Sequence, residues 1–112
     1  MKTGRTIQFK NWKCNIHIEK YSTGSTALIL KNAEIIDDDG YIAQPDEDTI
    51  AIASVNILGA NLPINEIAIK DYSENEGMLA ALIKGNIIHM PHKYIKSGFV
   101  EYPVAKLKIE IG

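Results

Sequence analysis

The chain has 112 residues, of which 46% are apolar and 23% are charged, and it carries a formal net charge of −2 at pH 7. This length predicts one domain, residues 1–112, large enough to bury about two-thirds of the surface that the unfolded chain exposes. The small negative charge argues against a protein that binds duplex nucleic acid by neutralising phosphates with clustered Lys and Arg.

The first third of the chain predicts an antiparallel meander of three strands. A short strand is expected at residues 6–9. Residues 12–19 alternate between apolar and polar side chains, which is the pattern of a strand with one buried and one solvated face. Gly24 provides the permissive backbone of a hairpin loop, and this loop leads into a third strand at residues 26–31.

The middle of the chain continues the β pattern. Residues 37–40, Asp-Asp-Asp-Gly, form a strong turn signal, because Asp side chains bond their own backbone and Gly accepts a positive φ. Residues 50–57 are a nearly continuous apolar run, which predicts a strand buried on both faces. After a connecting loop at residues 59–65, residues 66–70 predict another short strand.

One helix is expected, at about residues 74–84. Ser73 is a good N-cap and Glu76 follows three residues later, the reciprocal arrangement of a capping box. Apolar side chains at Met78, Leu79, Leu82 and Ile83 then share one helical face, and Gly85 stands where a left-handed C-cap would close the helix.

The C-terminal part predicts a short strand at residues 87–90, a loop at residues 91–98 and a clearly alternating strand at residues 105–111. Pro103 would place the start of that strand at a sheet edge or a bulge. The economical way to bury all these stripes is an α+β fold, in which a mostly antiparallel sheet of six to seven strands carries the single helix on one face.

The single cysteine and the N-terminus favour a cytoplasmic protein. Cys14 cannot form an intramolecular disulfide, and the first residues lack the apolar core of a secretory signal. No apolar run approaches the roughly 18 to 20 residues that span a bilayer. We therefore expect no membrane partner.

The spacing of Cys and His residues suggests a metal site, but the geometry of a strand argues against it. Cys14 and His17 have a Cys-x-x-His spacing that His89 and His92 could complete to four ligands. Residues three apart in a strand point to opposite faces, so Cys14 would face the core while His17 faced solvent. We expect no metal and no cofactor.

An acidic block places six carboxylates within twelve residues, and two interpretations remain open. The block is either a solvated hairpin tip, or a surface that imitates a phosphate backbone and occupies the basic groove of a protein partner. The candidate partner-binding residues are Asp37, Asp38, Asp39, Asp46, Glu47 and Asp48.

Aromatic side chains flank the expected helix and the last strand, and their amphipathic rings could line a pocket or a partner interface. Phe99 is one of them. Catalytic signatures such as Gly-x-Ser-x-Gly and His-Glu-x-x-His do not occur, so an enzyme is not expected. The candidate ligand pocket consists of Tyr72, Ser73, Asn75, Tyr94 and Tyr102.

Three segments, at residues 11–16, 69–78 and 97–104, resemble a family of small uncharacterised proteins of bacteriophages and other bacterial mobile elements. The specificity of the resemblance lies mainly in Asp-Tyr-Ser-Glu-Asn-Glu-Gly-Met at residues 71–78 and Ser-Gly-Phe-Val at residues 97–100. The chain departs from the family pattern at residues 34–49, where the Asp-rich stretch is longer than a tight acidic turn.

The resemblance implies a cellular context, the cytoplasm of a bacterial host, and no mechanism. It favours an accessory protein that binds a host protein stoichiometrically and inhibits a defence system, such as a CRISPR effector or another immune protein. Two alternatives stay open: sequestration of a nucleotide immune signal, and a structural or assembly protein of a phage that forms homo-oligomers through a sheet edge.

Overall fold

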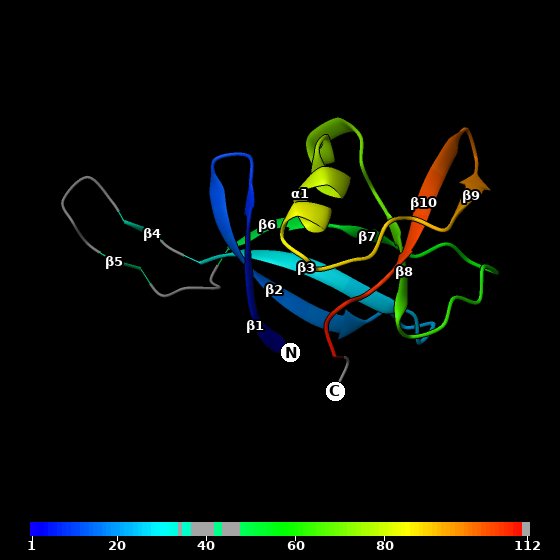
Figure 1. Cartoon of the computed structure of the whole chain (residues 1–112). Coiled ribbons are helices and arrows are strands. Elements are labelled where there is room, and N and C mark those ends of the chain that lie inside the picture. Colours follow the sequence, from blue (N-terminus) through cyan, green and yellow to red (C-terminus); the bar gives the residue numbers. More distant parts are fainter. Residues whose placement is uncertain (34, 37–41, 44–47, 111–112) are drawn as a thin grey trace.

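The computed structural model of the chain describes residues 1–33, 35–36, 42–43 and 48–110 (Figure 1). Its first seven strands are β1 (Lys2–Phe9), β2 (Trp12–Lys20), β3 (Thr26–Asn32), β4 (Ile35–Ile36), β5 (Ile42–Ala43), β6 (Thr49–Ile52) and β7 (Ser54–Val55). They are followed by β8 (Glu66–Ile69), a 3-10 turn (Ser73–Asn75), α1 (Met78–Lys84), β9 (Lys93–Ser97) and β10 (Val100–Lys106). The strand pairs are antiparallel and the helical part is short, so the predicted α+β class is confirmed.

The prediction of one sheet with six to seven strands is wrong. The described strands form two four-stranded sheets, in the orders β1-β2-β3-β6 and β7-β8-β10-β9, while β4 pairs with β5. The chain passes from the first sheet to the second at Ala53, within the run predicted as one strand. The N–H of Ala53 donates to the carbonyl of Leu28 at 2.8 Å, and its own carbonyl accepts from the N–H of Lys70 at 2.9 Å. An apolar run reports burial on both faces, but it does not report which strand each backbone edge pairs with.

Apolar side chains from both sheets and from α1 form one buried core. The helix lies over the first sheet (Figure 1). Burying each large aliphatic side chain stabilises the fold by about 1.5–3 kcal/mol. At the end of the helix, a Cβ on Gly85 would lie 2.3 Å from Cγ2 of Ile7, so only glycine lets the chain approach β1 this closely. The largest fully buried members of this core include Ile16, Leu28, Leu30, Ile67, Ile69, Met78 and Leu82.

The ends of the helix differ from the predicted ones. Ser73 has a φ of 57° and belongs to the 3-10 turn, whereas α1 starts after Gly77, whose φ is 93°. The backbone N–H of Leu79 donates to Oδ1 of Asp71 at 2.9 Å, so Asp71 supplies the side-chain acceptor that the capping-box prediction assigned to Ser73. At the other end Gly85 has a φ of −81°. The left-handed residue is Asn86, with a φ of 58°.

The predicted loop at residues 91–98 contains a strand, because β9 pairs with β10 in a hairpin that turns at Gly98. The last strand, β10, both starts and ends earlier than the predicted strand at residues 105–111, and among the described residues of that range only Ala105 and Lys106 belong to it. Pro103 lies inside β10 opposite Tyr94 and not at the start of the strand. Proline has no N–H to donate, and the pairing of β10 with β8 begins only at the next residue, Val104. Residues 87–90, predicted as a strand, retain an isolated bridge between Ile88 and Leu107.

Candidate functional site

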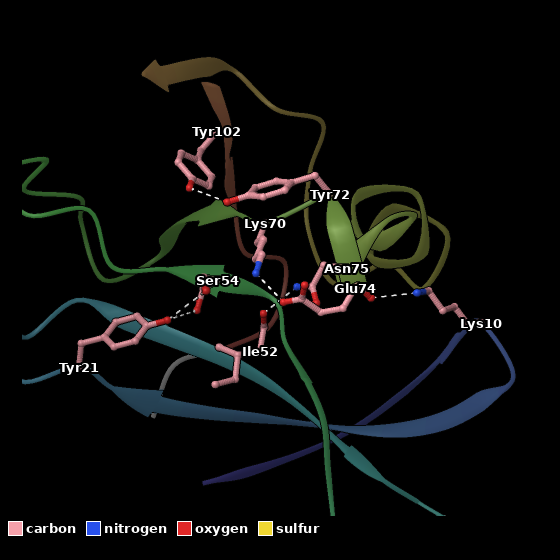
Figure 2. A network of polar contacts seen from close by, with 9 residues as sticks. All are labelled: Lys10, Tyr21, Ile52, Ser54, Lys70, Tyr72, Glu74, Asn75 and Tyr102. Carbon is pink, nitrogen blue, oxygen red and sulfur yellow. Dashed lines mark hydrogen bonds and ion pairs between the residues drawn. The ribbon is translucent and has the colours of Figure 1, made fainter. Parts of the chain in front are cut away.

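The polar segment at residues 70–77 connects several elements, as Figure 2 shows. Asn75 is only 2% exposed, and its side-chain N–H donates to the carbonyl of Ile52 on β6 at 2.8 Å. Nζ of Lys10, in the turn between β1 and β2, donates to the backbone carbonyl of Glu74 at 2.9 Å. These contacts attach the segment to the first sheet, so the side chain of Asn75 is committed to the fold.

Lys70 and Glu74 form an ion pair at the exposed side of the same segment (Figure 2). The hydrogen bond from Lys70 is the main cause that lowers the pKa of the Glu74 carboxyl to about 2. The same bond raises the pKa of Lys70. Nζ of Lys70 also lies 5.3 Å from the centre of the Tyr72 ring, within the range of a cation–π contact.

Tyr72 and Tyr102 join the segment to the second sheet. Their hydroxyl oxygens are 3.0 Å apart, and their rings meet at 53° with centres separated by 6.1 Å (Figure 2). The hydrogen bond with Tyr72, followed by burial, raises the pKa of Tyr102. Tyr102 is buried whereas Tyr72 is 40% exposed, so Tyr102 holds the Tyr72 ring in place from behind.

A groove of about 510 Å³ opens beside Tyr72, between the start of α1 and the β9–β10 hairpin. Its exposed aromatic members include Tyr94 on β9, 63% exposed, and Phe99 at the hairpin turn, fully exposed. Two carboxylates, Asp71 and Glu101, also line it. Apolar side chains of Ile69, Leu79, Val100 and Pro103 complete the lining.

The groove brings together two of the five residues predicted for a ligand pocket, Tyr72 and Tyr94. Tyr102 stands behind Tyr72, and neither Ser73 nor Asn75 lines the groove. Asn75 donates to the carbonyl of Ile52 and borders a different hollow, and Ser73 lies in the 3-10 turn. For these two residues a role in ligand binding stays a prediction.

Two lining carboxylates were not selected from the sequence. Asp71 precedes the helix by several residues, and Glu101 lies in a stretch that has no clear β alternation. The sequence places Phe99 only among the flanking aromatic residues. A large apolar residue directly after a turn glycine, as in Gly98-Phe99, is the signal that could have identified it, because a hairpin tip exposes its side chains.

The acidic block falls almost entirely outside the described residues. Asp37, Asp38, Asp39, Asp46 and Glu47 lie there, so their role stays a prediction. Asp48 is described and exposed, and its backbone carbonyl accepts from the N–H of Asn32 at 2.9 Å.

The residues considered for a metal site are dispersed. Cys14 is fully buried in the core, and burial raises the pKa of its thiol to about 11. His17 is only 9% exposed, which corrects its predicted solvent exposure: β2 is an interior strand, and Lys2 and Ile29 of the neighbouring strands stand on either side of His17.

The other two histidines lie in the C-terminal part. His89 is exposed, and Nε2 of His92 lies 2.9 Å from Oε1 of the buried Glu66. Within residues 1–33 and 48–110 and the short β4 and β5 strands, no group of three His, Cys, Asp or Glu side chains is arranged to hold a metal ion. In the same part of the chain, no helix has the length and apolar character needed to cross a membrane.

Comparisons of the chain with protein-family models, with curated proteins and with solved structures found no match.

Proposed function

We propose that this chain is a binding protein of a bacteriophage or bacterial mobile element, and that it holds a protein of the bacterial host in a stoichiometric complex through the groove. The observation that carries the proposal is the convergence of Tyr72, Tyr94 and Phe99, three exposed aromatic side chains, on one concave surface. A fully exposed Phe99 gains nothing for the folded chain alone, whereas burying it against a partner contributes favourably to binding.

The composition of the groove supports protein binding. Interface centres are rich in aromatic side chains that fill pockets, and a polar rim surrounds them. Tyr72 and Tyr94 provide large rigid rings with hydroxyl groups, while Asp71 and Glu101 provide the polar edge. Tyr72 is already held by Tyr102, so little side-chain entropy is lost when a partner immobilises its ring.

The cellular context comes from the resemblance to phage and mobile-element proteins. The two segments that carry it, residues 71–78 and 97–100, are far apart in the sequence, yet both contribute to the groove. Asp71 and Tyr72 come from the first segment, and Phe99 and Val100 from the second. This supports the groove as the working surface of an accessory protein that inhibits a bacterial defence protein, such as a CRISPR effector.

The test is capture of partners from a bacterial host that carries defined defence systems, combined with phage plaque counts in cells expressing the chain. We expect a Tyr94→Ala/Phe99→Ala double variant to lose at least about 10-fold in partner affinity and to lose protection of the phage. Met90→Ala is the matched control, because Met90 is 69% exposed and does not line the groove.

Both variants must keep the melting temperature of the unmodified chain, since the altered side chains are exposed. Equal partner binding by the double variant and the unmodified chain would contradict the proposal. If the chain instead captures no protein, and a nucleotide raises its melting temperature in a manner that the double variant abolishes, the groove sequesters a nucleotide signal.

A further inference from the structure

We propose that the groove receives a Lys or Arg side chain from an extended, basic segment of the partner protein. This inference rests on the proposed function and specifies the chemistry of the partner. It starts from the lining, in which two carboxylates stand among three aromatic rings.

Aromatic rings and carboxylates together form a site for a cation. The face of an aromatic ring attracts a cation electrostatically, and a carboxylate forms charge-assisted hydrogen bonds with guanidinium or ammonium groups. Tyr72 already shows this preference, because Nζ of Lys70 lies 5.3 Å from its ring centre. The lining of the groove holds Asp71 and Glu101 and no Lys or Arg among its described residues, so a positive charge entering it meets two negative ones.

The position of Asp71 fits this role. Its Oδ1 accepts from the N–H of Leu79 at 2.9 Å, which fixes the orientation of the carboxylate at the wall of the groove. A carboxylate has acceptor sites on both oxygens, so Oδ2 can accept a donor from a ligand while Oδ1 caps the helix. Glu101 approaches from β10, an element on the other side of the groove.

The strand β9 explains why the partner segment should be extended. It is the last strand in the order β7-β8-β10-β9, so one edge of its backbone faces away from the sheet. An extended chain can add to such an edge through main-chain hydrogen bonds, while its alternate side chains enter neighbouring pockets. Tyr94 lies on β9 and also lines the groove, so a segment paired with β9 would direct side chains over the groove.

A lysine next to the groove provides the control for the charge of the ligand. Lys96 on β9 is the cross-strand neighbour of Glu101 and does not line the groove. Lys93 lies on the same strand, and Lys70 is paired with Glu74. Removing the charge of Lys96 should therefore favour a basic ligand, whereas it would weaken an acidic or phosphorylated one.

The experiment uses fluorescence anisotropy with the full chain and three labelled heptapeptides that alternate valine with arginine, glutamine or glutamate. We expect the arginine peptide to bind at least about 10-fold more tightly than the glutamine peptide. Glu101→Gln should weaken arginine-peptide binding about 5-fold or more, and Lys96→Gln should leave it unchanged or strengthen it. Amide chemical shifts should change along β9.

Equal binding of the arginine and glutamine peptides, tighter binding of the glutamate peptide, or no binding of the arginine peptide at 1 mM (a concentration that detects dissociation constants of roughly 1 mM) overturns the inference. The proposed function has a separate readout. If Tyr94→Ala/Phe99→Ala still abolishes partner capture while Glu101→Gln leaves it intact, the groove binds a partner but does not recognise a cation. If neither variant affects capture, both proposals fail.

Discussion

Asn75 shows how a polar residue that looks available for a ligand can serve the fold. It is almost fully buried, and its amide donates to the carbonyl of Ile52. A local pattern cannot reveal this role, because the acceptor lies 23 residues away in the sequence. Within residues 70–77, the buried side chain of Asn75 therefore stabilises the fold, whereas the exposed ring of Tyr72 lines the groove.

We predict that Asn75→Ala lowers the free energy of unfolding by about 1–3 kcal/mol, because the carbonyl of Ile52 loses its side-chain donor. Urea denaturation measures the change. Glu76→Ala, at an exposed residue of the same segment, is the control and should change this free energy by less than about 0.5 kcal/mol. Similar losses for the two variants would contradict the assignment.

The thiol of Cys14 leads to a prediction about pH. Burial raises its pKa from 9.0 to about 11, so at pH 8 the thiolate should be roughly 100-fold scarcer in the folded chain than in the unfolded chain. Alkylation by iodoacetamide should be slower in buffer than in urea by at least about this factor.

The same pKa shift sets the sign of a stability change. The unfolded chain releases the thiol proton at a lower pH than the folded chain, so this contribution to the free energy of unfolding is present below pH 9 and decreases as pH rises toward 11. Equal alkylation rates in buffer and in urea would show that the side chain of Cys14 is accessible.

Among the elements, α1 starts with a cap that differs from the one predicted by the local capping rule. The capping box predicts Ser73 as the residue that stabilises the helix, whereas the structure assigns this role to Asp71. Gly77 makes the difference possible, because its positive φ turns the chain so that the side chain of Asp71 reaches the N–H of Leu79.

We predict that Asp71→Ala lowers the free energy of unfolding by about 0.5–2 kcal/mol, the usual range for a lost cap. Asp71→Asn keeps an acceptor oxygen, so this variant should retain most of the stabilisation that the cap provides. Ser73→Ala should change the free energy of unfolding by less than about 0.5 kcal/mol. Chemical denaturation of the three variants measures these changes. A larger loss of unfolding free energy for Ser73→Ala than for Asp71→Ala would show that Ser73, and not Asp71, caps the helix.

The β9–β10 hairpin is the element that sequence patterns represent least well. β9 is exposed on nearly its whole length, so its side chains do not alternate between a buried and a wet face. Periodicity detects a strand only when one face is buried. Tyr94 and Glu101 both belong to this hairpin. The sequence predicts Tyr94 through its aromatic ring, whereas no pattern distinguishes Glu101 from other surface carboxylates.

The arrangement of the whole molecule in two sheets depends on the point at which the chain passes from the first sheet to the second. Ser54 lies directly after Ala53 and is buried. Its hydroxyl oxygen accepts from the N–H of Leu28 at 2.9 Å and lies 2.9 Å from the hydroxyl of Tyr21 (Figure 2). One side chain thus replaces a ladder hydrogen bond where the backbone leaves the first sheet.

We predict that Ser54→Ala lowers the free energy of unfolding by about 1–3 kcal/mol, since the buried N–H of Leu28 is left without its acceptor. Tyr21→Phe removes both contacts of the Tyr21 hydroxyl with Ser54, to its backbone carbonyl at 3.1 Å and to its hydroxyl at 2.9 Å, and should lower the free energy of unfolding by about 0.5–1.5 kcal/mol. Thermal unfolding of both variants provides the comparison. A smaller loss for Ser54→Ala than for Tyr21→Phe would mean that Ser54 does not support the crossing.

The sequence by itself determined the α+β class, the approximate positions of strands such as β2 and β3, and the apolar face of the helix, because the spacing of apolar side chains reports which of them are buried. Only the tertiary structure decided that the strands form two sheets, that Asp71 caps α1, and that a groove joins Tyr72 to Phe99. Each of these depends on which backbone edges and side chains meet across long separations in the chain, and local periodicity carries no information about such partners.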